Sequence, residues 1–524
     1  MGVCRIAYRF DTIDRCLSEL TGLRVGDALR HALCRTWVQT LTEIGESLHI
    51  YVDAHLKPHW THLFMPCGLV AMRNRVMPCT RQIIVTNAQG YVWEILDHVG
   101  DHSLTRSLPG LEQELEDVTQ HRVTLTVVDR EANGLELAQI YAQSDHFALL
   151  TLLDGTTSDG LSVGTPALAH VFHLTGRWQP LAALPGESLA PARWSPDRKA
   201  ADDPRVFWLV RNEASAQVVA VYTLSQPVAD CAPEVAALLQ GPGARTVYRA
   251  RWPASENVIR EMVSGDNLNE NYGYTRTEVP NRLRQHQQVE AQAQVHTTQT
   301  QLAHTQHQLD LTRVRLEQQD HTAVAKQAAL ATAQTARHAE LQTRREAGQP
   351  TRRVEQQLAH LDDAAADLAQ RHQERVQQVH TQTLAPLDLR RTQLEATLVA
   401  RQAALAQIDT AQPMFERDLE KDQIMADFQA TLLNAHRGCC DHYFTGEWSH
   451  LELETATARN YRQRGRVVYA DTRVEVTLAA FAYRADQDLA EAACARFNAA
   501  RVHDAAGRLI VMGIAPFNHY VRQL

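Results

Sequence analysis

Two aspartates stand within or directly after strongly apolar segments, where a carboxylate has a chemical use. Asp53 lies inside the β-branched run at residues 47–56, and Asp129 directly follows the apolar run at residues 122–128. Burying a carboxylate is costly unless it is paired or binds a cation. Carboxylate oxygens suit Mg²⁺, and two such ions about 3.5–4 Å apart support in-line phosphoryl transfer. Taken singly, each aspartate is better explained as a strand-end cap or a surface acid, and only their joint placement favours a metal site.

The segments around these aspartates predict an α/β fold. Alternating or continuous apolar runs indicate strands, and longer amphipathic stretches between them indicate helices. The predicted strands are residues 47–56, 81–86, 91–96, 122–128 and 147–153, with helices at 108–119 and 135–143. Three strands followed by helix, strand, helix and strand predict a mixed sheet covered by helices.

The rest of the chain divides by composition. Residues 1–45 predict a helical N-terminal segment, 46–154 the first part of the α/β domain, and 155–245 a β-rich insert with many prolines and glycines. Helical character returns in residues 246–280, which we expect to close the domain. Residues 411–524 predict a small α+β region to which we assign no chemistry.

Residues 281–410 have the character of a coiled coil. No Phe, Tyr, Trp or Cys occurs between Tyr274 and Phe415, which is improbable for a globular core. Apolar residues recur every seven positions in the first half and alternate four and three apart in the second. They are Val295, Leu302, Leu309, Leu316, Ala323 and Leu330, then Val354, Leu358, Leu361, Ala365 and Leu368. Gly348 and Pro350 interrupt the helix midway, which favours an antiparallel hairpin; a parallel dimer and a polar, partly disordered helix are the alternatives.

Three segments together resemble the catalytic segments of DDE transposases from bacterial insertion sequences. The run IYVDAHLKPHW at 50–60 is similar to their first segment, in which a strand carries DxHxxP. The run VVDREANG at 127–134 resembles the second, an apolar strand followed by Asp-Arg. The run YRARWPASENVIR at 248–260, continued by NYGY at 271–274, resembles the third. The match covers roughly residues 46–280.

This resemblance implies an RNase H-like fold in which Asp53, Asp129 and Glu256 are catalytic and bind Mg²⁺ or Mn²⁺, with two ions expected. In that family the metals activate water to nick a DNA strand and then activate the freed 3′-hydroxyl to join target DNA. Three basic residues are candidate contacts to DNA phosphate, although each could be simply solvated: Lys57, Arg251 and Arg260.

The chain departs from the family pattern at two places. The family usually has two residues between the tryptophan and the glutamate, whereas three separate Trp252 from Glu256. The extra residue either turns Glu256 by about 100° around a helix or is absorbed before the helix starts, and Glu261 is the alternative acid. Only about 45 residues precede the first catalytic strand, which is consistent with a truncated DNA-reading region.

Composition and the remaining motifs narrow the alternatives. The net charge is −9, unusual for a nucleic-acid binder, and consistent with a chain that lacks a basic front end. No apolar run is long enough for a membrane span, and no GxxxxGK[ST] or CxxC motif occurs. The cluster His436, Cys439, Cys440 and His442 does not have the spacing of structural zinc ligands. We therefore expect a cytoplasmic bacterial protein, nucleoid-associated when bound to DNA.

The sequence thus predicts a metal-dependent enzyme of DNA transposition that cleaves and transfers strands. Its expected partners are DNA, as element ends and target, and further copies of the chain in a homodimer or higher oligomer formed by the coiled coil. One alternative is an inactive transposase relic that acts, if at all, as a coiled-coil interaction protein. The other is an RNase H-like nuclease.

Overall fold

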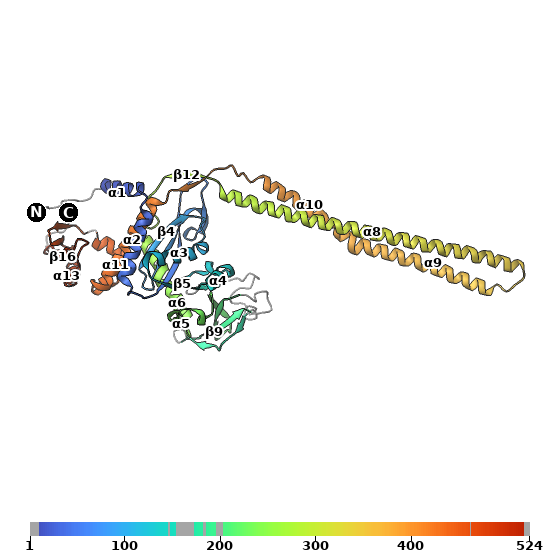
Figure 1. The fold of residues 1–524 in the computed structure, drawn as a ribbon, viewed down its shortest axis with the longest axis horizontal. Helices are drawn as coiled ribbons and strands as arrows, with labels where there is room; N and C mark the ends of the chain where they lie inside the picture. Colours follow the sequence, from blue (N-terminus) through green and yellow to red (C-terminus); the bar gives the residue numbers. More distant parts are fainter. Residues whose placement is uncertain are drawn as a thin grey trace. The chain divides into compact units, whose positions relative to one another are not determined.

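A computed structural model of the 524-residue chain describes residues 10–144, 147–153, 172–181, 185–194, 203–461 and 463–517. The chain forms two compact units (Figure 1). The first unit contains Met1–Glu278 and Met414–Leu524, and the second contains Val279–Pro413. None of the described helices is long and apolar enough to cross a membrane.

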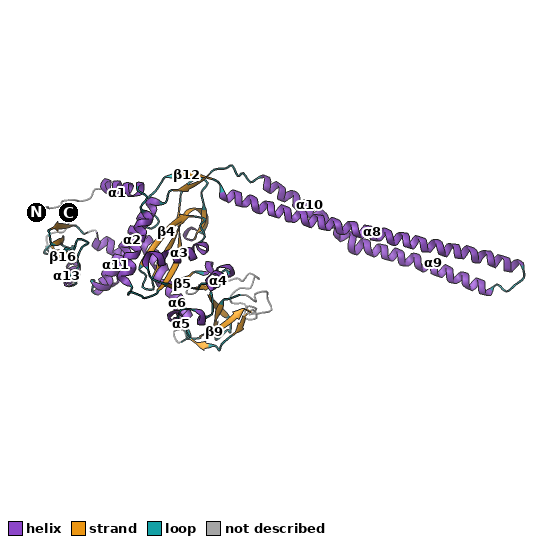
Figure 2. Cartoon of the chain, viewed as in Figure 1, coloured by secondary structure: helices purple, strands orange, loops and turns teal. Residues whose placement is uncertain are grey.

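An eleven-stranded mixed sheet forms the centre of the first unit (Figure 2). Its order is β2-β3-β1-β5-β6-β11-β10-β9-β7, with β4 beside β3 and β8 beside β9. The strands are β1 (Leu48–Pro58), β2 (Cys67–Val70), β3 (Arg75–Thr86), β4 (Val92–Val99), β5 (Val123–Val128), β6 (Ala148–Leu152), β7 (Phe172–Leu174), β8 (Gln179–Pro180), β9 (Glu187–Trp194), β10 (Val206–Asn212) and β11 (Val218–Leu224). All five strands predicted before residue 154 are confirmed.

The middle of this sheet combines antiparallel and parallel pairing. Strand β3 is antiparallel to both β1 and β4, whereas β5 is parallel to both β1 and β6. Every residue of β5 is buried, as expected for a parallel strand covered on both faces. The register pairs Val52 of β1 with Val128 of β5, so the residues that follow them lie at the same level of the sheet.

Helices cover both faces of the sheet. The described helices of the first unit are α1 (Phe10–Gly22), α2 (Gly26–Leu41), α3 (Leu104–Thr119), α4 (Leu135–Ala142), α5 (Pro233–Leu238), α6 (Gly243–Arg251), α7 (Asn257–Gly265), α11 (Glu420–His442), α12 (Leu453–Ala456) and α13 (Arg484–Ala499), of which α2 to α7 and α11 pack on the sheet. Because side chains alternate along a strand, Val85 of β3 joins a core under α2, α3 and α4, while Ile84 joins a core with α7 and α11. Tyr51 of β1 packs with α5 and α6 in a third core.

The β-rich insert predicted at residues 155–245 continues the central sheet. Strand β11 pairs with β6, so β7 to β11 extend the sheet on the side of β6, and Phe207 of β10 lies in their own apolar core. Three parts of the predicted insert, residues 155–171, 182–184 and 195–202, lie outside the described residues.

The region predicted at residues 411–524 contributes directly to the first unit. Helix α11 packs against β4 and α2, and β13 (Met414–Arg417) pairs with β12 (Arg276–Val279). A small sheet of β14 (Gly465–Tyr469), β15 (Arg473–Leu478) and β16 (Leu509–Ile514) follows, with α13 packed against β16. This region thus contains both helices and strands, and α11 is part of the main core.

The second unit is helical. It contains α8 (Arg282–Glu346), α9 (Arg352–Val379), a π-helical turn at His380–Leu384 and α10 (Ala385–Ala406). Helix α8 has 65 residues and is therefore about 98 Å long. It ends just before Gly348, which has φ +62°, as the glycine and proline there predict.

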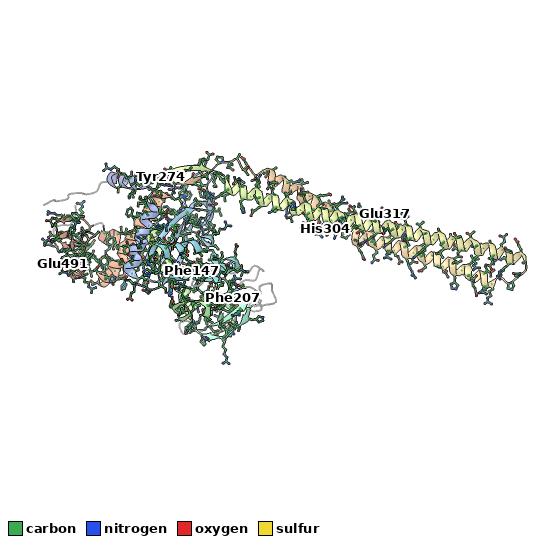
Figure 3. The ribbon with its side chains drawn as sticks, in the orientation of Figure 1. Phe147, Phe207, Tyr274, His304, Glu317 and Glu491 are labelled. Carbon is green, nitrogen blue, oxygen red and sulfur yellow. The ribbon has the colours of Figure 1, made fainter. Side chains whose placement is uncertain are left out.

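Helix α8 packs against both α9 and α10. The predicted seam positions are buried or half-buried, and Leu341, Val354 and Leu358 form a cluster beside the break. Polar contacts continue along the pair: His372 Nε2 lies 2.8 Å from Asp320 Oδ1, and Arg401 donates to Thr298 Oγ1 at 2.6 Å. Other side chains of α8, such as His304 and Glu317, are exposed (Figure 3).

Candidate active site

Strand pairing brings the two predicted aspartates together. Asp53 follows Val52 in β1, Asp129 follows Val128 at the end of β5, and these two valines are register partners. The backbone N–H of Ala54 donates to Asp53 Oδ1 at 2.9 Å, and that of Arg130 donates to Asp129 Oδ1 at 2.8 Å. The two strands that carry the aspartates are therefore neighbours in the sheet.

Glu256 approaches the same point from a helix that contains a π-helical turn. Helices α6 and α7 are continuous through Trp252–Glu256, where the N–H of Asn257 bonds to the carbonyl of Trp252 five residues earlier. A π-helical turn accommodates one more residue than an α-helical turn. The additional residue between Trp252 and Glu256 is therefore absorbed, and Glu256 lies on the same face as Arg251, which it contacts.

Pro253 gives a local reason for this turn. Proline has no backbone N–H, and its ring clashes with the carbonyl four residues earlier in a regular α-helix. In this chain Pro253 is the second residue of the π-helical turn, and its side chain is exposed. The widened turn thus relieves the conflict that a proline inside a continuous helix would create.

The guanidinium of Arg251 lies among the three acids. Its Nη1 donates to Asp53 Oδ2 at 2.9 Å, and its Nη2 contacts Glu256 Oε1 and lies 3.7 Å from Asp129 Oδ1. Tyr248, one turn earlier on α6, donates its hydroxyl to Asp129 Oδ1 at 3.2 Å. Acidic side chains from β1, the end of β5 and the α6–α7 helix therefore meet around the guanidinium of Arg251.

Burial perturbs the pKa of Asp53. Loss of hydration raises the pKa of Asp53 to about 6, and the charge of Arg251 opposes that rise. Ser255 also donates to Asp53 Oδ2, at 3.3 Å. Asp129 is more open, with 41% of its side chain exposed. The site therefore combines a half-buried carboxylate held by fixed donors with one that solvent and ligands can reach more freely.

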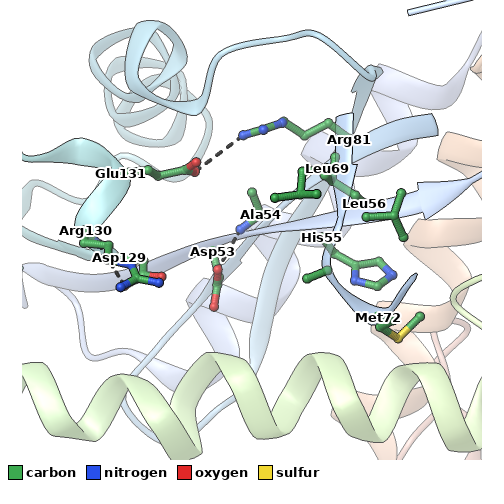
Figure 4. Close-up of a pocket in the computed structure, with 12 residues that line it drawn as sticks. Asp53, Ala54, His55, Leu56, Leu69, Met72, Arg81, Asp129, Arg130 and Glu131 are labelled. Atoms are coloured by element: carbon green, nitrogen blue, oxygen red, sulfur yellow. Dashed lines mark hydrogen bonds and ion pairs between the residues drawn. The ribbon is translucent and has the colours of Figure 1, made fainter. Parts of the chain in front are cut away.

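A pocket of about 500 Å³ opens beside the two aspartates (Figure 4). Asp53, Asp129 and Arg130 line one part of it, and Leu69 of β2 and Met72 of the β2–β3 connection line another. Arg81 is directed toward Glu131, 3.4 Å away, along the same pocket. Its volume is in the range of sites that hold small ligands or single nucleotides.

The three predicted DNA contacts have different environments. Lys57 is buried, and its ammonium lies 2.8 Å from Asp422 of α11, so its charge is already paired inside the protein. Arg251 is buried among the acids. Arg260 is exposed on α7, one turn after Glu256. The structure thus brings Arg251 to the acids, leaves Arg260 on the nearby surface and places Lys57 in a separate interior network.

The chemistry of the acids suits a divalent cation, but their present arrangement surrounds a guanidinium. Three carboxylates are oxygen donors of the kind that Mg²⁺ and Mn²⁺ prefer. Within the part of the chain that the structure describes, however, no three His, Cys, Asp or Glu residues lie close enough together to hold a metal ion. Metal binding by Asp53, Asp129 and Glu256 would require Arg251 to withdraw.

The sequence predicts Arg251 only as a contact to DNA phosphate, whereas the structure places its guanidinium among the three acids. The sequence pattern assigns no role to Tyr248. Tyr248 carries a weak signal: it lies three residues before Arg251 and so on the same helix face.

In the cluster of His436, Cys439, Cys440 and His442, both ring nitrogens of His436 have hydrogen-bond partners. They are the Tyr461 hydroxyl at 2.6 Å and the Leu451 carbonyl at 2.8 Å.

Comparison with known proteins found no relatives. No family model matches the chain, and neither a curated protein nor a solved structure matches it. The chemistry of the site must therefore be inferred from its own residues.

Proposed function

We propose that this chain is a DDE transposase-like enzyme that cleaves and transfers DNA strands with the help of divalent metal ions. The observation that carries the proposal is that Asp53, Asp129 and Glu256, from three separate elements, all lie around the guanidinium of Arg251. These are the acids of the three motifs that resemble the catalytic segments of that family. The β4-β3-β1-β5-β6 part of the sheet, three antiparallel strands extended by two parallel ones, is the RNase H-like part in this proposal.

In this proposal the three carboxylates hold Mg²⁺ or Mn²⁺, which when bound supplies an activated oxygen nucleophile and stabilises the leaving oxygen. The chain's own groups orient the acids. The Ala54 N–H and the Ser255 hydroxyl hold Asp53, and the Tyr248 hydroxyl holds Asp129. Arg251 balances the acids before metal binds and then contacts a DNA phosphate, for which its planar fork of donors is suited.

We further propose that α8 and the α9–α10 arm form an antiparallel coiled-coil hairpin. In support, residues near the start of α8 contact the end of α10, and residues near the end of α8 contact the start of α9. The contacts are Thr298 with Arg401, Asp320 with His372, and Arg345 with Glu355. The hairpin would pair two copies of the enzyme and hold two DNA ends together. The enzyme would act in the bacterial cytoplasm, at the nucleoid.

A plasmid-nicking assay tests the enzymatic proposal. We expect the purified chain to nick supercoiled DNA with Mn²⁺ and not with EDTA, and Asp53→Asn or Asp129→Asn to abolish nicking without unfolding the protein. Joining of a 3′-hydroxyl end to target DNA distinguishes a transposase from a nuclease on the same fold. Folded protein that neither nicks nor joins DNA would favour an inactive copy that acts only through its coiled coil.

A further inference from the structure

The connection between β2 and β3 exposes apolar side chains that have no partner in the core. Leu69, Met72 and Val76 are each more than half exposed, and so is Trp60, which lies before β2. Isolated exposed apolar residues are ordinary, but a group on one projecting turn marks a contact surface. We call residues 69–76 the β2–β3 turn.

The β2–β3 turn is held in shape from beneath. Its strands are in antiparallel register, with Val70 opposite Arg75, and Asn74 adopts a left-handed conformation with φ 46° that closes the turn. Val70, Met77 and Cys79 form a small buried cluster against Leu56 of β1. Alternate side chains therefore anchor the turn, and those between them are directed outward.

The same turn carries positive charge. Arg73 and Arg75 are exposed, and neither makes an ion pair with any residue that the structure describes. The guanidinium of Arg73 lies 5.9 Å from the centre of the Trp60 ring. Glu131, one of the acids that line the pocket, is paired with Arg81. Flat or apolar side chains beside unpaired arginines match the chemistry of a nucleic-acid strand.

The pocket links this surface to the candidate active site. Leu69 and Met72 line the same pocket of about 500 Å³ as Asp53 and Asp129 (Figure 4). A nucleotide with its phosphate at the aspartates can therefore extend its sugar and base over the β2–β3 turn.

We propose that the β2–β3 turn binds unpaired bases of the DNA strand next to the cleaved phosphate. Leu69, Met72 and Val76 contact the faces of the bases, and Trp60 offers a ring for stacking. Arg73, beside Trp60, contacts an adjoining phosphate. This inference rests on the proposed function, and it adds that the enzyme takes its substrate with bases unstacked beside the cut.

Binding of two labelled oligonucleotides tests this inference without catalysis. One is an oligothymidylate of about 20 nucleotides, and the other has the same backbone without bases; fluorescence anisotropy is measured in EDTA. We expect the protein to bind the thymidylate at least about fivefold more tightly, the lower end of what one stacked base contributes. Met72→Ser with Val76→Ser should remove this preference and leave binding of the abasic strand unchanged.

The control is Leu174→Ser with Val219→Ser, which alters two exposed apolar residues on β7 and β11, away from β2 in the sheet. This variant should keep the full preference for bases. Equal affinity of the unaltered protein for both strands, or a preference that survives in the turn variant, overturns the inference while the proposed function stands. Loss of self-association in the turn variant, with DNA binding intact, would assign the surface to a second copy of the chain and also overturn it. No binding to any DNA, duplex included, would overturn the proposed function as well.

Discussion

Replacing Arg251 by glutamine tests whether the three acids depend on a cation. The side chain of Asp53 is 16% exposed and that of Glu256 is 28% exposed, so both interact with Arg251 in a partly buried setting. Asp129 lies 3.7 Å away and is 41% exposed, so solvent screens its interaction and it adds little. Removing one partner of a buried pair costs roughly 3–5 kcal/mol. Because these pairs are partly exposed, we expect Arg251→Gln to lower the free energy of unfolding by about 3 kcal/mol, the lower end of that range.

The assay is urea unfolding followed by circular dichroism, in EDTA and in Mn²⁺. The midpoint of Arg251→Gln should fall in EDTA and recover substantially in Mn²⁺, because a divalent ion replaces the missing positive charge. Mn²⁺ should also bind the variant more tightly than the unaltered protein, because the Arg251 guanidinium and Mn²⁺ compete for the same three carboxylates. Coupling of this kind typically changes affinity by roughly 5- to 150-fold. Electron paramagnetic resonance of free Mn²⁺ measures this affinity directly.

Arg260→Gln is the matched control. It removes the same charge from the exposed face of α7, one turn beyond Glu256, and should change neither the urea midpoint nor Mn²⁺ affinity measurably. If Arg251→Gln leaves stability in EDTA and Mn²⁺ affinity unchanged, then Arg251 does not hold the acids in solution, and the reasoning from its contacts is refuted.

Three further predictions concern the surrounding fold. Lys57→Met removes one of the positive charges paired with buried Asp422 and should lower the free energy of unfolding by about 3 kcal/mol. Urea midpoints measure this loss. The salt dependence of DNA binding should stay unchanged, because Lys57 is buried. Burial raises the pKa of Glu112 to about 8 from 4.5, so the folded state retains a proton over that range and stability falls as pH rises through it. Glu112→Gln should flatten that fall, and urea midpoints below pH 4.5 and above pH 8 check it. Deletion of Pro253 should convert the π-helical turn to α-helix and keep Glu256 facing the acids, so nicking persists; insertion of one alanine after residue 255 should abolish nicking.

Much of the fold follows from local patterns. The apolar runs around Asp53 and Asp129 locate β1 and β5, because continuous burial requires such runs. The heptads of residues 281–410 likewise predict which side chains of α8 and α9 are buried, and Gly348 marks where α8 ends. These features depend on residues close in sequence, so periodicity and turn chemistry suffice to predict them.

The remaining features depend on partners distant in sequence. The sequence predicts Lys57, in the first catalytic segment, as a contact to DNA phosphate. Its actual partner, Asp422, lies 365 residues later, on a helix that covers β4. The position of Arg251 among the acids needs both the β1–β5 pairing and the π-helical turn. Spacing alone left two orientations for Glu256, and only the helix geometry selects one of them.

The most direct test of the central claim compares two carboxylates of the same pocket. Asp129→Asn removes a proposed metal ligand, and Glu131→Gln removes a neighbouring acid that pairs only with Arg81 among the ion pairs of the described residues. In a nicking assay on supercoiled DNA with Mn²⁺, we predict that Asp129→Asn loses activity by at least about a hundredfold, as expected when a group that stabilises the transition state is removed. We predict that Glu131→Gln stays near the unaltered rate. Equal rates for the two variants, with both folded, would contradict the assignment of this site.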